Sequence, residues 1–435
     1  MKARSIPSHD PAQRGAGRSY SGLHAALAAA AVLLVAACGG PAAPDGPGTP
    51  DPTECDDPHA ITADVITPTT WGPGDPDCVD YVVDGNLDVT AELTVLPDVT
   101  VEFMQDAGLR LEAGGRIDAQ GSADAPVTFT GTQSVRGHWR GILIRRSTAD
   151  NVFDHVVIEY AGRSVAGSDQ WGVALGLGSR DAQIDRALNT TLTNTTVRES
   201  QAYGLYVAAN STFAPDGFAG NVFTANGAGG VHTSARASRF LDASSEYAGN
   251  DDDHVLLDAR HASDDVDVDA TWPSLGDDVR YRVNDIVEVD AVLNIEAGAV
   301  LSFESAGGIY VFGPEAGIEA IGTAAAPIVF TGENEIAGAW RGVYLRSTRM
   351  AGNTMDHVVI EHGGGDDFDI RPTPAEANLI VGQASHTTAQ LALTNATVAH
   401  SGAFGVWVGE DSIVNPDVCT VNAFLSNAGD DCHID

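Results

Sequence analysis

The chain has 435 residues, of which 43% are apolar, 19% charged and 6% aromatic, so it is not mainly disordered. It is long enough for more than one ordinary domain or for one long repeat body. Its 60 Asp and Glu against 23 Lys and Arg give a net charge of −37, which excludes nucleic acid as a partner because phosphate binding needs clustered cations.

Residues 1–37 have the organisation of a secretory signal. A polar start with four cations and one acid precedes an apolar stretch from Leu23 to Ala37. At about 15 residues this stretch is shorter than the roughly 20 needed to span a bilayer. A positive start, a short apolar segment and small residues at its end are typical of signal peptides. We predict that residues 1–37 are removed, which takes away four cations and one anion and leaves a charge of −40.

The apolar stretch ends in Val35-Ala36-Ala37-Cys38, an aliphatic residue and two small ones before a cysteine. This motif resembles the lipobox of bacterial lipoproteins. The resemblance implies cleavage before Cys38 and a lipid on that residue that anchors the protein to a membrane. Plain cleavage and an uncleaved anchor are the alternatives. Gly39 follows, not the Asp that favours inner-membrane retention in enterobacterial lipoproteins, so the resemblance implies a cell-envelope site at the outer membrane or the cell surface.

The next segment, residues 38–70, contains seven Pro, six acids and no Lys or Arg. Sequence of this kind cannot bury enough surface to fold and is typical of extended linkers. We predict that it is a tether between the membrane and the body.

Four cysteines remain once Cys38 is assigned to lipid: Cys55, Cys78, Cys419 and Cys432. An even number in an exported protein favours disulfides, and four cysteines allow three pairings. We favour Cys55–Cys78 with Cys419–Cys432, because the other two pairings would join opposite ends of an elongated body. Neither pair has the CxxC spacing of a redox or zinc site, which indicates a structural role.

From Trp71 onward the chain repeats itself. Segments match at an offset of 201 residues, for example Ala125–Gly131 with Ala326–Gly332 and Tyr203–Val207 with Phe404–Val408. The segment starting at Asp154 matches that at Asp356 at an offset of 202, which indicates a one-residue loop insertion. We predict a 201-residue internal duplication with one copy over 71–271 and a truncated, continuous copy over 272–435.

Each copy contains short stretches in which apolar and polar residues alternate, such as Leu93-Thr94-Val95 and Val99–Phe103. Alternation at period two predicts half-buried strands, and Gly, Asp, Asn and Pro between them predict turns. Like strands recur at roughly 22–26 residues, as from Leu93 to Ile117, which favours a coil of parallel strands over a sandwich. The sequence therefore predicts an all-β solenoid.

The order of these segments, from Val101-Glu102-Phe103 through Val127-Thr128-Phe129 and Trp139-Arg140-Gly141 to Ile158-Glu159-Tyr160, carries a resemblance. It resembles the modules of right-handed parallel β-helix proteins, which have the pectin-lyase-like fold and are common among bacterial surface lipoproteins. The second copy has the same order, so the resemblance covers nearly all of 71–435. It implies the fold and its handedness, while many such modules have no assigned chemistry.

The same fold houses pectate lyases, polygalacturonases and alginate epimerases, so the resemblance admits an enzyme. Uronate lyases need a cation and a base, usually Arg or Lys, and Lys2 is the only lysine in the chain. Arg140 and Arg341 recur at the same place in both copies, which indicates rung-to-rung packing. Asp154-His155 is similar to the Asp-His pair of pectate lyases but lacks the surrounding motif, and polygalacturonase motifs are absent. We assign no catalytic residue.

Two acidic clusters are dense enough to bind Ca²⁺ if turns fold them inward. They comprise Asp251, Asp252 and Asp253, and Asp366, Asp367 and Asp369. Neither has a counterpart at the 201-residue offset or the spacing of an EF-hand, so solvated acidic loops are the alternative. Calcium is therefore the one cofactor that we consider.

Four aromatic residues could stack on sugar rings if they line one face: Trp171, Tyr206, Tyr310 and Trp407. Trp139 and Trp340 recur in both copies, which indicates a turn or core position. The sequence thus favours a surface-anchored lipoprotein that acts as a non-catalytic scaffold or binding module for a glycan or another cell-surface partner. The alternative is a polysaccharide-active lyase or hydrolase of the pectin-lyase-like fold.

Overall fold

The structure of the protein is a computed structural model, which divides the chain into residues 1–54 and a compact unit from Cys55 to Asp435. It describes Cys55 and residues 57–75, 78–147, 149–164, 172–179, 186–261, 264–276, 278–348, 350–366, 368, 375–383 and 388–435. No helix within these ranges is long and apolar enough to cross a membrane.

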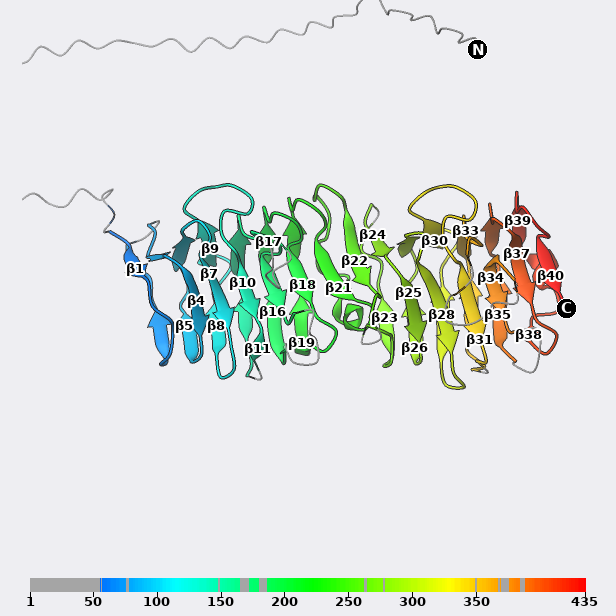
Figure 1. The fold of residues 1–435 in the computed structure, drawn as a ribbon, viewed down its shortest axis with the longest axis horizontal. Coiled ribbons are helices and arrows are strands. Elements are labelled where there is room, and N and C mark those ends of the chain that lie inside the picture. Colours follow the sequence, from blue (N-terminus) through cyan, green and yellow to red (C-terminus); the bar gives the residue numbers. More distant parts are fainter. Residues whose placement is uncertain are drawn as a thin grey trace, which may run out of the picture. The chain divides into compact units, whose positions relative to one another are not determined.

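The described unit is nearly all β, and its strands pair in parallel sheets that run along one axis (Figure 1). This arrangement is consistent with a parallel solenoid, in which each strand pairs with the next rung, meaning the next turn of the coil. The predicted all-β class with parallel strands is therefore confirmed. Helical structure in the described ranges is short: the 3-10 helix η1 (Ala237–Phe240) and the α-helix α1 (Val418–Val421).

Two sheets contain only strands before residue 225. One has seven strands: β1 (His59–Ile61), β3 (Tyr81–Val83), β6 (Thr100–Phe103), β9 (Val127–Gly131), β13 (Val156–Glu159), β17 (Thr196–Arg198) and β20 (Val222–Thr224). The other has six: β2 (Thr69–Trp71), β5 (Glu92–Val95), β8 (Arg116–Gln120), β12 (Val152–Asp154), β16 (Thr190–Thr193) and β19 (Phe213–Ala219). A short pair beside them is formed by β11 (Arg146–Ser147) and β15 (Arg186–Ala187).

Two six-stranded sheets contain only strands after residue 269. The first has β23 (Ala270–Trp272), β26 (Val292–Ile295), β29 (Gly317–Ile321), β32 (Thr354–Asp356), β35 (Gln390–Thr394) and β38 (Ile413–Val414). The second has β25 (Ile286–Val289), β28 (Gly308–Phe312), β31 (Val343–Arg346), β34 (Ala377–Val381), β37 (Phe404–Val408) and β40 (Cys432–Ile434).

A thirteen-stranded sheet runs through both regions. It contains β4 (Asn86–Val89), β7 (Gly108–Leu111), β10 (Ile142–Ile144), β14 (Leu175–Leu177), β18 (Leu205–Val207), β21 (Val231–Ser234), β22 (His254–Asp258), β24 (Arg280–Val283), β27 (Val300–Phe303), β30 (Ile328–Gly332), β33 (Val358–Glu361), β36 (Thr397–Ala399) and β39 (Ala423–Leu425). We refer to residues 71–271 as the first half and to residues 272–435 as the second half.

One continuous hydrophobic core lies between the sheets and is built from alternate residues of each strand. In β6, Val101 and Phe103 are fully buried, whereas Thr100 and Glu102 are partly exposed. Like residues stack between rungs, since Leu93 is in register with Ile117 at the predicted spacing. Successive side chains of a strand point to opposite faces, so the residues between the core positions form the outer faces of the sheets.

Residues at matching positions in the two halves lie on different sheets. Tyr81 and Tyr281 are 200 residues apart in the sequence. Tyr81 belongs to the seven-stranded sheet, whereas Tyr281 lies in β24, which continues the thirteen-stranded sheet beside β22. A strand of the second half thus belongs to the next sheet around the coil compared with its counterpart in the first half. The offset between the two copies alone did not predict this shift.

The tryptophans that recur at the 201-residue offset have the same surroundings. Trp139 and Trp340 are both fully buried. Each stacks on a core phenylalanine with ring centroids 4.0 and 4.2 Å apart. Each also donates its indole N–H to a backbone carbonyl at 2.8 Å. These are core positions, one of the two alternatives that the sequence left open.

The body begins earlier than its composition predicted. Within residues 38–70, which we expected to be a tether, β1 pairs with β3 and Val65 bridges Val89. Pairing is possible there because Val65, only 5% exposed, contributes to the core in spite of the acidic residues around it. The predicted Cys55–Cys78 disulfide is present and joins this first segment to the residues before β3.

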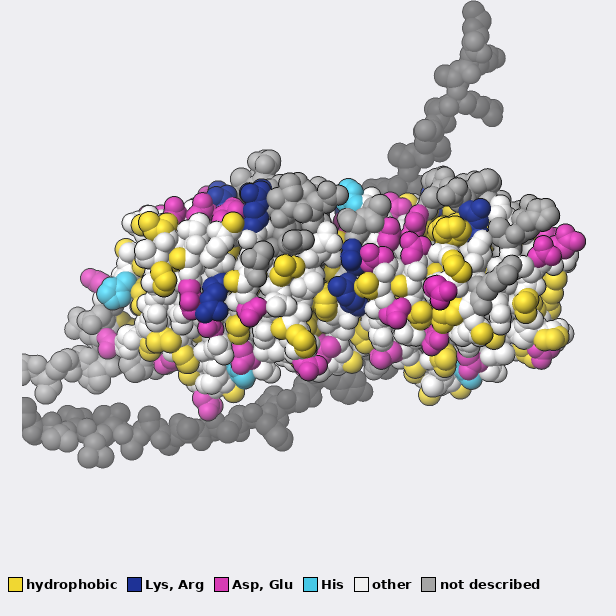
Figure 2. Space-filling model, turned by 90° about the horizontal axis from the view of Figure 1, so that it is seen from below, with side chains coloured by type: hydrophobic (Ala, Val, Ile, Leu, Met, Phe, Trp, Pro, Cys, Tyr) yellow, Lys and Arg dark blue, Asp and Glu magenta, His cyan; other side chains and the backbone are white. Residues whose placement is uncertain are grey.

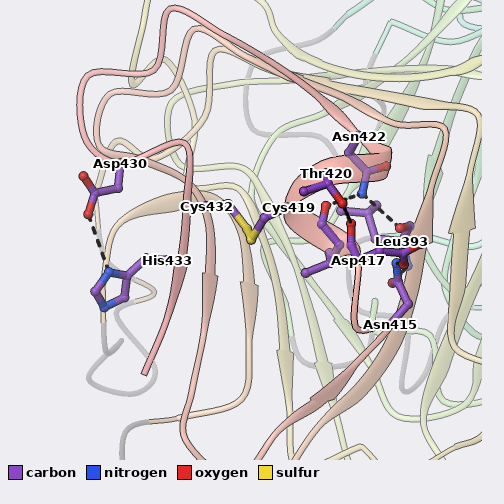
Figure 3. Close-up of a disulfide and its surroundings, with 10 residues drawn as sticks. Leu393, Asn415, Asp417, Cys419, Thr420, Asn422, Asp430, Cys432 and His433 are labelled. Atoms are coloured by element: carbon purple, nitrogen blue, oxygen red, sulfur yellow. Dashed lines mark hydrogen bonds and ion pairs between the residues drawn. A yellow bond between two sulfur atoms is a disulfide. The ribbon is translucent and has the colours of Figure 1, made fainter.

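The other end of the described unit is closed by the second predicted disulfide, Cys419–Cys432, which joins α1 to β40 (Figure 3). Two asparagines tie the same segment to the preceding rung. Asn415 accepts the backbone N–H of Leu393 at 2.9 Å, and Asn422 donates to the carbonyl of Leu393 at 3.0 Å. Both sequence-local disulfides are therefore confirmed.

Candidate functional site

The first predicted calcium cluster does not converge on one point. Asp251 pairs with Arg136 at 2.9 Å, and Asp252 pairs with Arg280 at 2.9 Å. Asp253 accepts a backbone N–H three residues earlier at 2.7 Å. Among the described residues, no group of three or more His, Cys, Asp or Glu is arranged to hold a metal ion.

Of the second predicted calcium cluster, only Asp366 lies within the described residues, and it is exposed. Asp367 and Asp369 lie outside the described residues. Cys38 lies outside them as well, so calcium binding at this cluster and lipid attachment both remain predictions.

The charged residues that recur in both halves bind backbone carbonyls or neighbouring polar side chains. Arg140 and Arg341 each donate Nε to a backbone carbonyl, at 2.8 and 3.0 Å. Asp356 accepts hydrogen bonds from Thr394 and Asn395. Burial raises the pKa of Asp356, but these bonds and His357 outweigh it and hold the pKa at about 2. Asp154 has the same kinds of partner in the first half.

The outer face of the thirteen-stranded sheet carries two tyrosines and two histidines, which we call the tyrosine–histidine cluster: Tyr203, Tyr206, His232 and His254. Tyr206 and His232 are in register on β18 and β21 and alternate with core residues, so both point away from the core. The ring of His232 lies 5.3 Å from Tyr203 and 5.0 Å from Tyr206. Both histidines are only 2% exposed.

A hydrogen-bonded chain links the backbone carbonyl of Asp252, an imidazole and a phenol in this cluster, and the carboxylate of Asp252 lies close to the imidazole. The Tyr203 hydroxyl lies 3.1 Å from Nε2 of His254. Nδ1 of His254 lies 3.1 Å from the carbonyl of Asp252 and 3.2 Å from its carboxylate. With Nδ1–H directed at Asp252, the imidazole accepts the phenol proton at Nε2. The order Asp252–His254–Tyr203 is that of a proton relay.

Burial keeps the phenol and the imidazole of the relay neutral at neutral pH. It raises the pKa of Tyr203 to about 12 and lowers the pKa of His254. The guanidinium of Arg282 lies close enough to lower the Tyr203 pKa, although burial outweighs it. A neutral imidazole beside a neutral phenol can accept a proton and return it, which is general acid–base chemistry.

The second histidine is held by a separate carboxylate. Nε2 of His232 lies 3.3 Å from Asp258, which also receives two hydrogen bonds from Arg260 at 2.8 and 2.6 Å. Burial raises the pKa of Asp258, but the hydrogen bonds from Arg260 and His232 outweigh it and leave the pKa well below its usual range. Asp258 is therefore a charged, paired group at the edge of the cluster.

A second outer face, on the sheet that contains β25 and β28, is aromatic. Its members, which we call the aromatic cluster, are Tyr310, Tyr344, Phe368 and Trp407. The rings of Tyr310 and Tyr344 lie 5.4 Å apart, and Phe368 lies 5.6 Å from Tyr344. All four residues are at most 4% exposed, so they pack against one another instead of presenting an open platform.

Four carboxylates lie close together beside this sheet. An isolated parallel bridge brings Asp265 and Asp267 near Glu288 and Asp290. Burial and then repulsion from these neighbours raise the pKa of Asp265 to about 7. Arg236 pairs with Asp267 at 3.1 Å. Asp265 is half-buried beside the bridge, whereas Asp267 is exposed.

The structure divides the four predicted sugar-stacking residues between these faces. Tyr310 and Trp407 lie on one face, Tyr206 lies in the tyrosine–histidine cluster, and Trp171 lies outside the described residues. Sequence reasoning missed His232 and His254, because a single histidine in a strand gives no signal until the strand register places it beside a tyrosine.

Acidic side chains are spread along the body, and arginines lie among them in small groups, on the face shown in Figure 2. Neither a comparison with protein-family models nor one with curated proteins gives a match.

Proposed function

We propose that the protein is a surface-anchored lipoprotein whose body is a right-handed parallel β-helix built from a 201-residue duplication. It acts as a non-catalytic scaffold or as a binding module for a glycan or another cell-surface partner. The cell-envelope location, at the outer membrane or the cell surface, rests on the lipobox-like motif at Cys38.

One observation carries the scaffold proposal. The polar and charged residues that recur in the two halves are used for structure, as with Arg140 and Arg341, which each hold a backbone carbonyl. A catalytic group is needed at one site, whereas a group that holds a turn is needed in every copy. The charged residues that recur in both copies are therefore explained by their role in the fold and do not require a catalytic role.

The lipid anchor is tested by metabolic labelling with radioactive palmitate. The wild-type chain should take up label and the Cys38→Ser variant should not. Equal labelling of the two would remove the lipoprotein from the proposal, while the body could still be a scaffold.

A polysaccharide-active enzyme is the second candidate, and the Asp252–His254–Tyr203 relay favours it. The relay would move a proton at the substrate, and Arg282 would have to exchange its ion pairs with Asp252, Glu304 and Glu333 for a carboxylate of the substrate. The net charge of −40 after signal removal opposes anionic polymers at long range, so the enzyme would depend on this local cation.

The two candidates are separated by incubating the detergent-solubilised full chain with pectate, alginate and polygalacturonate, with and without Ca²⁺. The scaffold proposal expects no unsaturated products and no new reducing ends. Turnover that is lost in both Tyr203→Phe and His254→Gln, and kept in the surface variant Arg198→Gln, would establish the enzyme instead.

A further inference from the structure

Arg346 in β31 is an unusual arginine in this acidic chain. Its Nη1 donates to the hydroxyl of Tyr310 at 3.2 Å, and its guanidinium lies 5.5 Å from the ring of Phe312. Among the described residues it makes no ion pair with a carboxylate. Arg280, by contrast, pairs with two acidic residues and Arg282 with three. The positive charge of Arg346 therefore has no counter-charge in the described part of the protein.

Two hydrogen-bond donors at this place are buried without a partner. They are the hydroxyl of Tyr344 and Nε of Arg346. Tyr344 is fully buried, and the charge that acts on its hydroxyl is that of Arg346. Leaving a polar group buried and unpaired costs about 1–3 kcal/mol, and more for a charged group. Native structures rarely keep such groups, so each one calls for an explanation.

We propose that Tyr344 and Arg346 form a binding site for an oxyanion: a carboxylate, a sulfate or a phosphate. The fork of a guanidinium matches two oxygens of such a group, and a phenol hydroxyl supplies a further donor. The oxyanion would satisfy Nε of Arg346 and the Tyr344 hydroxyl together and would supply the missing counter-charge.

An oxyanion from solvent would reach the site past the side chain of Phe312. This side chain is 38% exposed at the end of β28, and it covers the guanidinium and stacks on Tyr310 with ring centroids 5.8 Å apart. An exposed side chain at a strand end can change rotamer at little cost. The oxyanion can therefore enter where Phe312 turns aside, and a ring that carries it can stack on the same phenylalanine.

This site goes beyond the proposed function, because it would bind an oxyanion whether the body is a scaffold or an enzyme. The test uses the detergent-solubilised full chain and titrates sodium acetate, sulfate and phosphate at constant ionic strength. Binding is followed by the ¹⁵Nε resonances of the arginines. The anion that saturates the Arg346 resonance identifies the chemistry of the natural ligand.

The variants expected to weaken binding are Arg346→Gln and Tyr344→Phe, each by about tenfold or more, which corresponds to one lost hydrogen bond to a charged group. The matched control is Arg198→Gln, which removes an arginine that pairs with Glu159 at 2.7 Å and should leave the affinity unchanged.

Tyr344→Phe keeps the ring and the packing, so it stays informative if Arg346→Gln does not fold. No saturable shift of Arg346 with any of the three anions, or unchanged affinity in Tyr344→Phe, would overturn the site. Both results would leave the palmitate labelling and the polymer incubations unaffected, so failure here is distinct from failure of the proposed function.

Discussion

The outer faces of the two halves differ in chemistry at matching sequence positions. Tyr206 and His232 correspond, 201 residues further on, to Trp407 and His433. The strand neighbours of Tyr206 and Trp407 are buried and apolar in both halves. The first-half face holds buried histidines with carboxylate partners, whereas the second-half face holds packed aromatic rings. Packing fixes the inward residues in every rung, and only the outward residues are free to acquire a function.

A difference at a single residue on the outer face also changes the electrostatic surroundings of its neighbours. In the first half, Asp88 is in register with Arg110, which binds it through two nitrogens at 2.8 and 3.0 Å. At the matching register in the second half, Glu288 faces Tyr310 instead. The carboxylates beside Glu288 include Asp265, whose pKa is raised to about 7. The arginine of the first half is thus replaced by a tyrosine at a place where several carboxylates lie close together.

The largest expected effect on stability tests whether matching core positions in the two halves contribute equally. Trp139→Ala and Trp340→Ala should each lower the free energy of unfolding by about 3–5 kcal/mol, because each removes a buried ring and its indole hydrogen bond. Urea unfolding followed by circular dichroism measures both. Val135→Ala and Ile336→Ala are the matched controls, since these side chains are 56% and 64% exposed. A large effect in only one half would contradict the equivalence.

The next effect concerns Asp258, the carboxylate that contacts His232 on the first-half face. Asp258→Asn should cost about 2–4 kcal/mol, because it leaves His232 and Arg260 without their buried partner. The folded pKa of Asp258 is lowered, so its contribution is present above the unfolded pKa of about 3.9 and is lost as the pH falls through the folded pKa.

Unfolding midpoints of the wild type and Asp258→Asn at pH 7 and pH 2 measure this contribution. The difference between the two proteins should shrink at the lower pH. Arg198→Gln, which breaks an ion pair whose arginine is about half exposed, should cost less than about 1 kcal/mol at either pH. A cost for Asp258→Asn no larger than that of the control would show that the cluster is not held by this carboxylate.

The sequence predicted the features that recur along the chain and missed those that occur once. Leu93 and Ile117 could be paired in advance, because stacking repeats the same inward residue at a fixed spacing. The relay of Tyr203 and His254 could not, because the two residues are 51 positions apart and only the register brings them together. The start of the body before residue 70 was missed because acidic composition obscured one buried valine, Val65.

A smaller effect concerns the carboxylates around Asp265, at the boundary between the two halves. The folded pKa of Asp265 is raised, so the stability associated with its neutral form is complete below about pH 4 and is lost as the pH rises to about 7. Asp265→Asn stays neutral and should exceed the wild type in stability at pH 8 by about 1 kcal/mol after solvent screening, but not at pH 4. The control is Asp124→Asn, in an exposed turn, which should show no such pH dependence.

The smallest expected effect distinguishes two tyrosines of the aromatic cluster that differ in one hydrogen bond. Tyr344→Phe removes a buried hydroxyl that has no partner, so it should raise the free energy of unfolding by up to about 1 kcal/mol. Tyr310→Phe removes the acceptor of the Arg346 hydrogen bond and should lower it by about 1 kcal/mol. Thermal unfolding of the two variants in anion-free buffer gives the comparison. Because the rings and their packing are kept in both, opposite signs would isolate the hydroxyl of Tyr344 as a group that costs stability, and equal signs would mean that it has a partner in solution.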